Sequence, residues 1–147
     1  FATREAFDAE LVRTLRDAGA EWIVLAGFMR VVTPVLLDAF KDRVVNIHPA
    51  LLPAFPGVDA QAQALAYGVK VTGCTVHFVD AGVDTGPIIL QETVPVLDGD
   101  DRDALAKRIL EKEHASMVRA LDLISRGRVH IEEGAARRRV VIRPERE

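Results

Sequence analysis

Short apolar runs alternate with helix-patterned segments along most of this chain, and this alternation limits the possible folds more than any other feature. The run 22–26 is continuous and short, as expected of a strand buried on both faces of a sheet, and 43–47 also has the pattern of a buried strand. The segments around them carry apolar residues at helical spacing. Helices are the usual connections between parallel strands. The sequence therefore predicts an α/β fold whose early strands are parallel.

Capping residues and glycines set the limits of the expected elements. Thr3 can cap a first helix that ends at Gly19, and Thr33–Pro34 can open a second. Asp59 can cap a third helix that stops at Gly68, and a fourth runs from about 101 to 125. The expected strands cover 22–26, 43–47, 71–79, 88–96, 129–132 and 138–142. Because the later strands follow one another more closely, we expect a mostly parallel, partly mixed sheet.

Composition is that of one globular domain, with 49% hydrophobic and 28% charged residues. A net charge of −3 argues against a nucleic-acid or membrane partner. The single cysteine, Cys74, lies in an expected strand and predicts a small buried side chain. The histidines lack metal-ligand spacing, so we expect no metal site. Without a visible signal peptide or membrane-length apolar run, we expect a cytoplasmic protein. The arginines at 137–139 indicate a solvated tail.

Two short segments place polar side chains at the ends of apolar runs. Asn46 and His48 lie two residues apart, so both point to the same face of the expected strand. Pro49 restricts His48 to an extended backbone. Asp84 lies in the glycine-bearing loop after the 71–79 run. Because ligands bind at the carboxyl ends of strands in open α/β sheets, we expect these side chains to share a crevice.

An amide, an imidazole and a carboxylate in one crevice suit attack on a carbonyl carbon. The amide stabilises charge on the oxygen, the imidazole transfers protons, and the carboxylate orients the imidazole. From the residues alone, two alternatives stay open. His48 can be a hydrogen-bonded structural residue at a strand end, and Asp84 can be a turn former.

Two further residues are candidates for the same crevice. Glu113 falls in the middle of the apolar stripe of the 101–125 helix, where an unpaired carboxylate is costly. It either reaches solvent or a structural arginine, or it contacts substrate where the stripe meets the crevice. His77 alternates with Val76 and Phe78, and it either lines the crevice or makes a structural hydrogen bond.

Four motifs in order resemble the phosphoribosylglycinamide (GAR) formyltransferases of purine synthesis: 25–30 (LAGFMR), 46–53 (NIHPALLP), 77–79 (HFV) and 84–89 (DTGPII). The resemblance extends from about Arg4 to Gly134. Methionyl-tRNA formyltransferases and formyltetrahydrofolate deformylases share the Asn/His/Asp set, but the 55–59 stretch and the Glu113–His114 pair are more similar to the GAR enzymes. The resemblance implies a Rossmann-like, three-layer αβα formyltransferase domain over 1–147.

The resemblance also implies a reaction and a set of site residues. The formyl group of 10-formyltetrahydrofolate would pass to the amine of GAR, with Asn46, His48 and Asp84 as catalytic residues. The residues implied to bind folate are Arg4, Met29, Arg30, Val31, Val32, Asn46, Asp80, Ala81, Gly82, Val83 and Asp84. Those implied to bind GAR are Leu110, Glu111, Lys112 and Glu113. The expected partners are these two small molecules, and the expected assembly is a monomer or homodimer.

The family further implies about sixty residues ahead of the position of Phe1, including a Gly/Ser-rich loop that grips the GAR phosphate at a helix N-terminus. The sequence contains no such loop, so we expect the 147-residue chain alone to fail in transfer to GAR. Two alternative functions stay open. One is a deformylase, in which water replaces the amine, and the other is a folate-binding protein without transfer.

Overall fold

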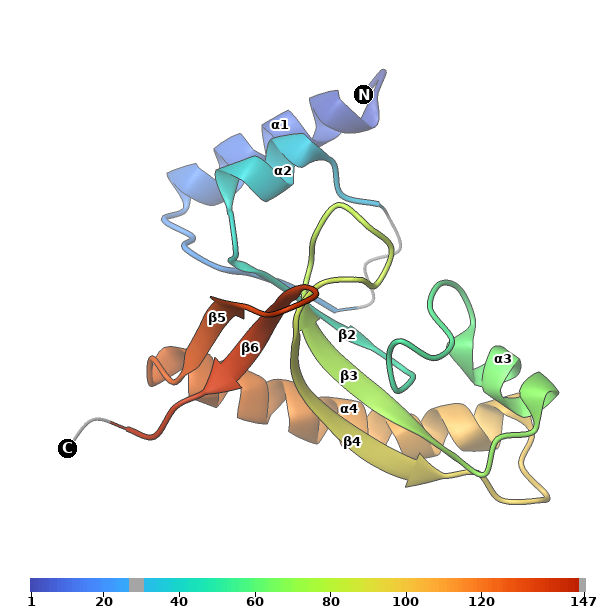
Figure 1. The fold of residues 1–147 in the computed structure, drawn as a ribbon. Helices are drawn as coiled ribbons and strands as arrows, with labels where there is room; N and C mark the ends of the chain where they lie inside the picture. The colour runs from blue at the N-terminus through green and yellow to red at the C-terminus, as the bar shows by residue number, and fades with distance from the viewer. Residues whose placement is uncertain (27–30, 146–147) are drawn as a thin grey trace.

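The structure is a computed structural model that describes residues 1–26 and 31–145 (Figure 1). Its helices are α1 (Arg4–Asp17), α2 (Pro34–Ala39), α3 (Ala60–Tyr67) and α4 (Arg102–Ser125). Its strands are β1 (Ile23–Leu25), β2 (Val44–His48), β3 (Val71–Phe78), β4 (Ile88–Pro95), β5 (Val129–Glu133) and β6 (Arg138–Ile142). Every expected helix and strand is present, with limits within a few residues of those predicted.

The described strands form a mixed sheet in the order β1-β2-β3-β4, beside a separate β5–β6 hairpin. The β1–β2 pairing is parallel, whereas β2–β3 and β3–β4 are antiparallel. The α/β fold with a mixed sheet is therefore confirmed. Antiparallel pairings have a larger share of the described sheet than predicted, because the connection through α3 returns the chain antiparallel to β2 instead of crossing over.

Helices cover both faces of the sheet, which gives the three predicted layers (Figure 1). Val44 and Val45 are consecutive in β2, so they point to opposite faces. Val44 packs in a cluster with α1 and α2 residues such as Val12 and Leu36. Val45 packs with Phe78 of β3 and Ala120 of α4. The polar ends of the central strands thus lie between two apolar layers.

Strand β1 differs from the prediction of a strand buried on both faces. It is three residues long, and it pairs only with β2 among the described strands. Val24 is 40% exposed, while Ile23 is buried. The prediction was wrong because a continuous apolar run indicates a strand but does not tell whether a second layer covers each face of that strand.

Most of the expected helix caps are confirmed. Thr3 accepts a hydrogen bond from the Ala6 N–H, and Asp59 accepts one from the Ala62 N–H. Thr33 precedes α2 as expected, but its side chain makes no capping bond. Its hydroxyl and its backbone N–H instead donate to the buried carboxylate of Asp8 in α1, at 2.8 and 2.7 Å. This pair joins α1 to the start of α2.

The predicted arginine tail is exposed at Arg137 and Arg139, but it is not a free tail. Residues 138–142 form β6, which pairs with β5 and folds back onto the body. The Arg138 guanidinium donates two hydrogen bonds to the Asp42 carboxylate, and Arg137 donates one to the carbonyl of Thr85. Three consecutive arginines remain fully solvated only when no acceptor faces them. The hairpin brings Arg137 to the Thr85 carbonyl and Arg138 to the Asp42 carboxylate.

The expected burial of Cys74 is confirmed. Its sulfur lies 3.5 Å from the Ser116 hydroxyl of α4, and burial raises the pKa of the thiol. Within the described ranges, no helix is both long and apolar enough to cross a membrane.

Candidate active site

A cavity of about 570 Å³ opens where β2 and β3 approach the loops that follow them. This volume lies in the range of small-molecule sites. Several valine side chains line the cavity together with a group of polar side chains. Asn46, His48, His77, Asp84 and Glu113 all line it. The residues predicted to share a crevice are therefore brought together.

Strand pairing explains how the polar side chains reach one face. Asn46 of β2 lies opposite His77 of β3, and His48 lies opposite Thr75. Directly opposed residues share a face, and so do residues two apart on one strand. The Asn46 side chain makes no hydrogen bond to any described residue, so its amide remains available to a ligand in the cavity.

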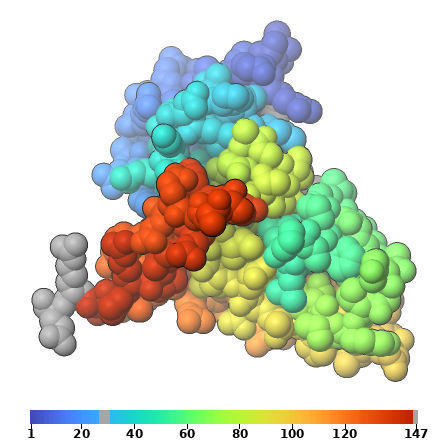
Figure 2. Space-filling model, in the orientation of Figure 1, coloured from blue at the N-terminus to red at the C-terminus, as the bar shows by residue number. Residues whose placement is uncertain are grey.

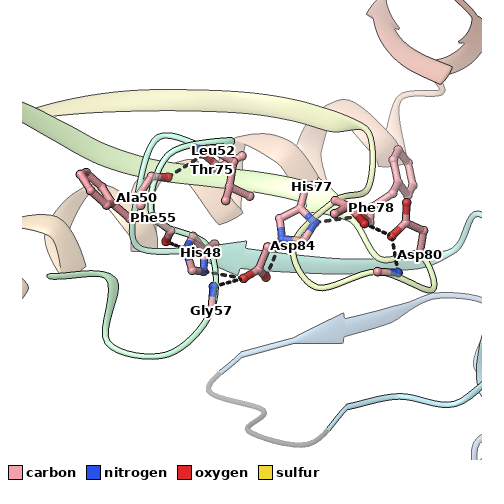
Figure 3. A network of polar contacts seen from close by, with 12 residues as sticks. His48, Ala50, Leu52, Phe55, Gly57, Thr75, His77, Phe78, Asp80 and Asp84 are labelled. Carbon is pink, nitrogen blue, oxygen red and sulfur yellow. Dashed lines mark hydrogen bonds and ion pairs between the residues drawn. The ribbon is translucent and has the colours of Figure 1, made fainter. Parts of the chain in front are cut away.

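Asp84 is the centre of the polar cluster (Figure 3). One carboxylate oxygen, Oδ2, lies 3.4 Å from His48 Nδ1 and accepts a 2.8 Å hydrogen bond from the Gly57 N–H. The other oxygen, Oδ1, lies 3.8 Å from His77 Nε2. Asp84 itself has a φ of 53°, in the left-handed region. Such a backbone is costly unless surrounding contacts maintain it, and it is often found at functional sites.

The loop that carries Asp84 is held by its own side chains. Asp80 Oδ1 accepts hydrogen bonds from the Gly82 N–H at 3.0 Å and from the Thr85 hydroxyl at 2.6 Å. At the end of the loop, a Cβ on Gly86 would lie 1.7 Å from the Phe78 carbonyl oxygen. Only glycine permits this close approach. The 80–86 loop is therefore shaped to present Asp84 to the histidines.

The loop after β2 closes over His48. The carbonyl of Phe55 lies 2.8 Å from His48 Nε2. Because a carbonyl oxygen can only accept, Nε2 carries a proton, and Nδ1 faces Asp84. Thr75 supports the same loop, since its hydroxyl donates to the Ala50 carbonyl at 2.7 Å and accepts from the Leu52 N–H at 3.1 Å. The imidazole is thus fixed by one backbone group and one carboxylate.

His77 is a second, less polar neighbour of Asp84. Its Nδ1 donates to the Phe78 carbonyl at 2.8 Å, whereas its buried Nε2 has no hydrogen-bond partner among the residues that the structure describes. Burial lowers the pKa of His77, although the Phe78 carbonyl and Asp84 act in the opposite direction. Both open alternatives for His77 hold at once, because it lines the cavity and makes a structural hydrogen bond.

Glu113 reaches the cavity from α4 and makes no hydrogen bond or ion pair to a described residue. Burial raises the pKa of this carboxyl, although His114 and His48 nearby act in the opposite direction. Of the two alternatives for Glu113, the structure favours a position where the stripe meets the cavity. A half-buried carboxyl without a partner among the described residues is suited to bind hydroxyl groups of a ligand.

Comparison with known proteins places this site in a family. The model of a family described as formyl transferase matches residues 1–121. The chain belongs to the formyl transferase family.

Individual formyl transferases are closely similar to this chain. Phosphoribosylglycinamide formyltransferase of Mycobacterium tuberculosis H37Rv is 52% identical over 119 residues, which make up 81% of this chain and 55% of that protein. The Drosophila melanogaster trifunctional purine biosynthetic protein adenosine-3 is 53% identical over 127 residues, or 86% of this chain and 9% of that protein. The chain therefore spans about half the length of the bacterial relative and a small part of the insect one.

Solved structures agree with the fold. Glycinamide ribonucleotide transformylase 1 of Symbiobacterium toebii has a TM-score of 0.94 at 53% identity, covering 98% of this chain and 66% of that chain. A formyltetrahydrofolate deformylase from Pseudomonas syringae is less similar, with a TM-score of 0.85 at 31% identity, over 92% of this chain and 44% of that chain.

The fold brings most of the residues implied to bind folate to the cavity. Those that line it besides the catalytic set are Val31, Val32, Asp80, Ala81, Gly82 and Val83. Arg4 does not line it, because it is exposed at the start of α1. Met29 and Arg30 lie outside the described residues.

Of the four residues implied to bind GAR, only Glu113 lines the cavity. Leu110, Glu111 and Lys112 are exposed on α4. Successive helix residues are rotated by about 100°, so four in a row cannot all face one ligand. A role for these three in binding GAR stays a prediction.

Sequence reasoning missed several residues that line the cavity: Leu25, Pro49, Gly57, Val58, Asp59, Gln61, Thr85 and Arg102. Leu25 had a signal, since it ends a strand on the carboxyl side of the sheet. Arg102 had none, because its contact is an ion pair of 2.9 Å with Asp59, 43 residues away. No three His, Cys, Asp or Glu side chains in the described ranges are grouped to hold a metal ion.

Proposed function

We propose that this protein transfers the formyl group of 10-formyltetrahydrofolate to the amine of GAR, in de novo purine synthesis. The observation that carries the proposal is the convergence of Asn46, His48 and Asp84 on one cavity. The relatives named phosphoribosylglycinamide formyltransferase support the choice of substrates. The proposal assigns residues 1–147 to the folate-binding and catalytic half of a formyltransferase domain.

The reaction begins when the amine nitrogen of GAR attacks the formyl carbon. The carbon–oxygen double bond opens, and negative charge collects on the formyl oxygen. The Asn46 amide, which has no partner among the described residues, donates to that oxygen. Preorganised donors of this kind are worth about 3 kcal/mol in the transition state.

His48 and Asp84 handle the positive charge and the proton. The attacking amine becomes cationic, and it must lose a proton before the bond to folate nitrogen breaks. Asp84 accepts that proton, directly or through a water molecule, and the leaving folate nitrogen takes one up. In this proposal the formyl oxygen binds beside the His48 ring, and the protonated ring adds positive charge there. The facing Asp84 carboxylate stabilises that protonated ring.

The cavity walls provide places for both substrates. The aromatic pterin of folate suits the apolar wall that includes Val31, Val32 and Val79. The ribose hydroxyls of GAR suit the Glu113 carboxyl. For the remaining implied residues, including Arg4, Met29 and Arg30, folate binding is a prediction. A single buried cysteine fits a reducing compartment, and we place the protein in the cytoplasm as a monomer or homodimer.

The test is to incubate the full-length protein with 10-formyltetrahydrofolate, with and without GAR, and to measure formyl-GAR, formate and tetrahydrofolate. Formyl-GAR in amounts equal to the tetrahydrofolate released supports the proposal. Formate release that does not depend on GAR would identify a deformylase instead. Folate binding by calorimetry without either product would leave only a binding protein, and would contradict the proposed transfer.

A further inference from the structure

We infer that Arg137, in the turn of the β5–β6 hairpin, is a positioning residue that holds the 80–86 loop so that Asp84 meets His48. The role of the loop in transfer rests on the proposed function. Arg137 itself lies beyond residue 121, where the match to the family model ends. It also belongs to the arginine run that the sequence alone assigned to solvent.

The β5–β6 hairpin is packed against the body of the protein. Val129, Ile131 and Val140 are partly buried against the cluster that contains Phe78 and Ile89. These two residues lie on either side of the 80–86 loop in sequence, in β3 and β4. The apolar face of the hairpin therefore packs on the strands from which the loop emerges.

A second anchor fixes the tip of the hairpin. Arg138 Nη1 and Nη2 donate to the two carboxylate oxygens of Asp42, at 3.1 and 2.6 Å. Such a bidentate pair defines orientation as well as distance. Asp42 lies two residues before β2, the strand that carries Asn46 and His48. The tip is therefore tied to the same element as the histidine.

From this tip, Arg137 Nη2 donates a hydrogen bond to the carbonyl of Thr85. Figure 2 shows the tip, in red-orange, directly against the yellow-green surface of the 80–86 loop. Thr85 is the residue after Asp84, so this contact fixes the peptide on the carboxyl side of the catalytic carboxylate. On the other side, the Asp80 side chain accepts hydrogen bonds from Gly82 and Thr85, which belong to the same loop.

The backbone of Asp84 makes such support necessary. Its φ of 53° is sparsely populated for residues other than glycine, so the loop has more relaxed paths available. Among the described residues, its carboxylate is tied to the body by the Gly57 N–H and the two histidines. Removing the contact at Thr85 allows the segment to shift, and the distance from Asp84 to His48 then varies.

The hairpin offers a matched set of variants. Arg137→Ala removes the contact, and Arg137→Lys keeps a cationic donor. Arg139→Ala removes the same charge from a neighbouring exposed position, where Arg139 makes no hydrogen bond or ion pair to a described residue. In the full-length protein, Arg137→Ala should lower kcat roughly 3- to 10-fold with little change in KM for GAR. Arg137→Lys should recover part of the loss, and Arg139→Ala should match the parent protein.

Hydrogen–deuterium exchange tests the same inference without turnover. Amides of residues 80–86 should exchange roughly 2- to 10-fold faster in Arg137→Ala than in Arg139→Ala, with α4 unchanged in both. Equal exchange in the two alanine variants would overturn the inference, as would faster exchange with an unaltered kcat. If the parent protein transfers no formyl group, the proposed function falls, and the exchange comparison still decides whether Arg137 holds the loop.

Discussion

Asp84 contacts His48, His77 and Gly57 and has a left-handed backbone conformation. Asparagine at this position removes the negative charge and keeps the shape of the side chain. Asn tolerates left-handed φ values and has the same size, so the loop should keep its path. The amide cannot stabilise an imidazolium. Asp84→Asn should therefore lower turnover by on the order of 10²-fold or more and alter its pH profile. Asp98→Asn, at an exposed site that does not line the cavity, is the control. Retained activity with an unchanged pH profile would make Asp84 a turn residue only.

His48→Ala should lower turnover by on the order of 10²–10⁴-fold while folate binding stays nearly intact. The reason is that the ring contacts Asp84 and the Phe55 carbonyl but forms only part of the cavity wall. Steady-state kinetics and calorimetry with folate measure the two effects separately. His130→Ala, in β5, provides the control. Turnover near that of the parent protein would reject an acid/base role for His48.

Glu113 should link stability to pH. Burial raises the pKa of this carboxyl above its usual value near 4.5, so the folded state holds a proton that the unfolded state has lost. Stability therefore falls as pH rises through this window, and the full cost is present at neutral pH. Glu113→Gln should raise Tm at pH 7, and the gain should vanish below pH 4.5. The exposed Glu111→Gln should show no such trend. Glu113→Gln should also weaken GAR binding and leave folate binding unchanged. An unchanged affinity for GAR would contradict the role assigned to Glu113.

At the residue scale, the sequence predicts side chains that lie at strand ends and misses those that act through backbone atoms. The position of His48 follows from the alternation of β2, and Asp84 follows from the loop after β3. The Phe55 carbonyl and the Gly57 N–H have no signal of their own, because every residue carries these groups. Arg102 and Arg137 were missed since their partners are 43 and 52 residues away.

At the scale of elements, β3 links the sheet to the loop over His48. The Thr75 hydroxyl serves three partners in this link: the Ala50 carbonyl, the Leu52 N–H and the Gln91 amide. Thr75→Val keeps the shape but leaves buried polar groups unpaired, each at about 1–3 kcal/mol. The free energy of unfolding should fall by about 2–4 kcal/mol in denaturant titrations. Thr93→Val, exposed on β4, is the matched control. An equal loss in both variants would show that the Thr75 network contributes nothing.

The elements themselves were predictable because capping residues, glycines and apolar runs are local signals. The direction of each strand was less predictable than the elements themselves. The sequence between β2 and β3 holds a helix, which favours a parallel crossover, but α3 is only eight residues long and leads back antiparallel. The burial of β1 also depended on neighbours that a local pattern does not contain.

At the scale of the whole molecule, two apolar layers hold the sheet while the cavity opens between the loops at its end (Figure 1). A ligand that binds this folded arrangement only should stabilise all of it. Folate at one hundred times its Kd should add about 2.7 kcal/mol and raise Tm by about 8 °C. His48→Ala should show a similar increase, because it is expected to keep folate binding. A Tm that does not respond to folate would contradict the assignment of the cavity.

The acid/base pair is closed over by main-chain atoms of one loop, the Phe55 carbonyl on His48 and the Gly57 amide on Asp84. Side-chain replacement does not delete either group. Side-chain substitutions in this loop therefore leave His48 and Asp84 with the same contacts as long as the backbone keeps its path. Gly57 has a φ of 84°, which favours glycine, so the path is restricted at this residue. The site therefore tolerates a change in the amino-acid composition of this loop but not a change in the curvature of its backbone.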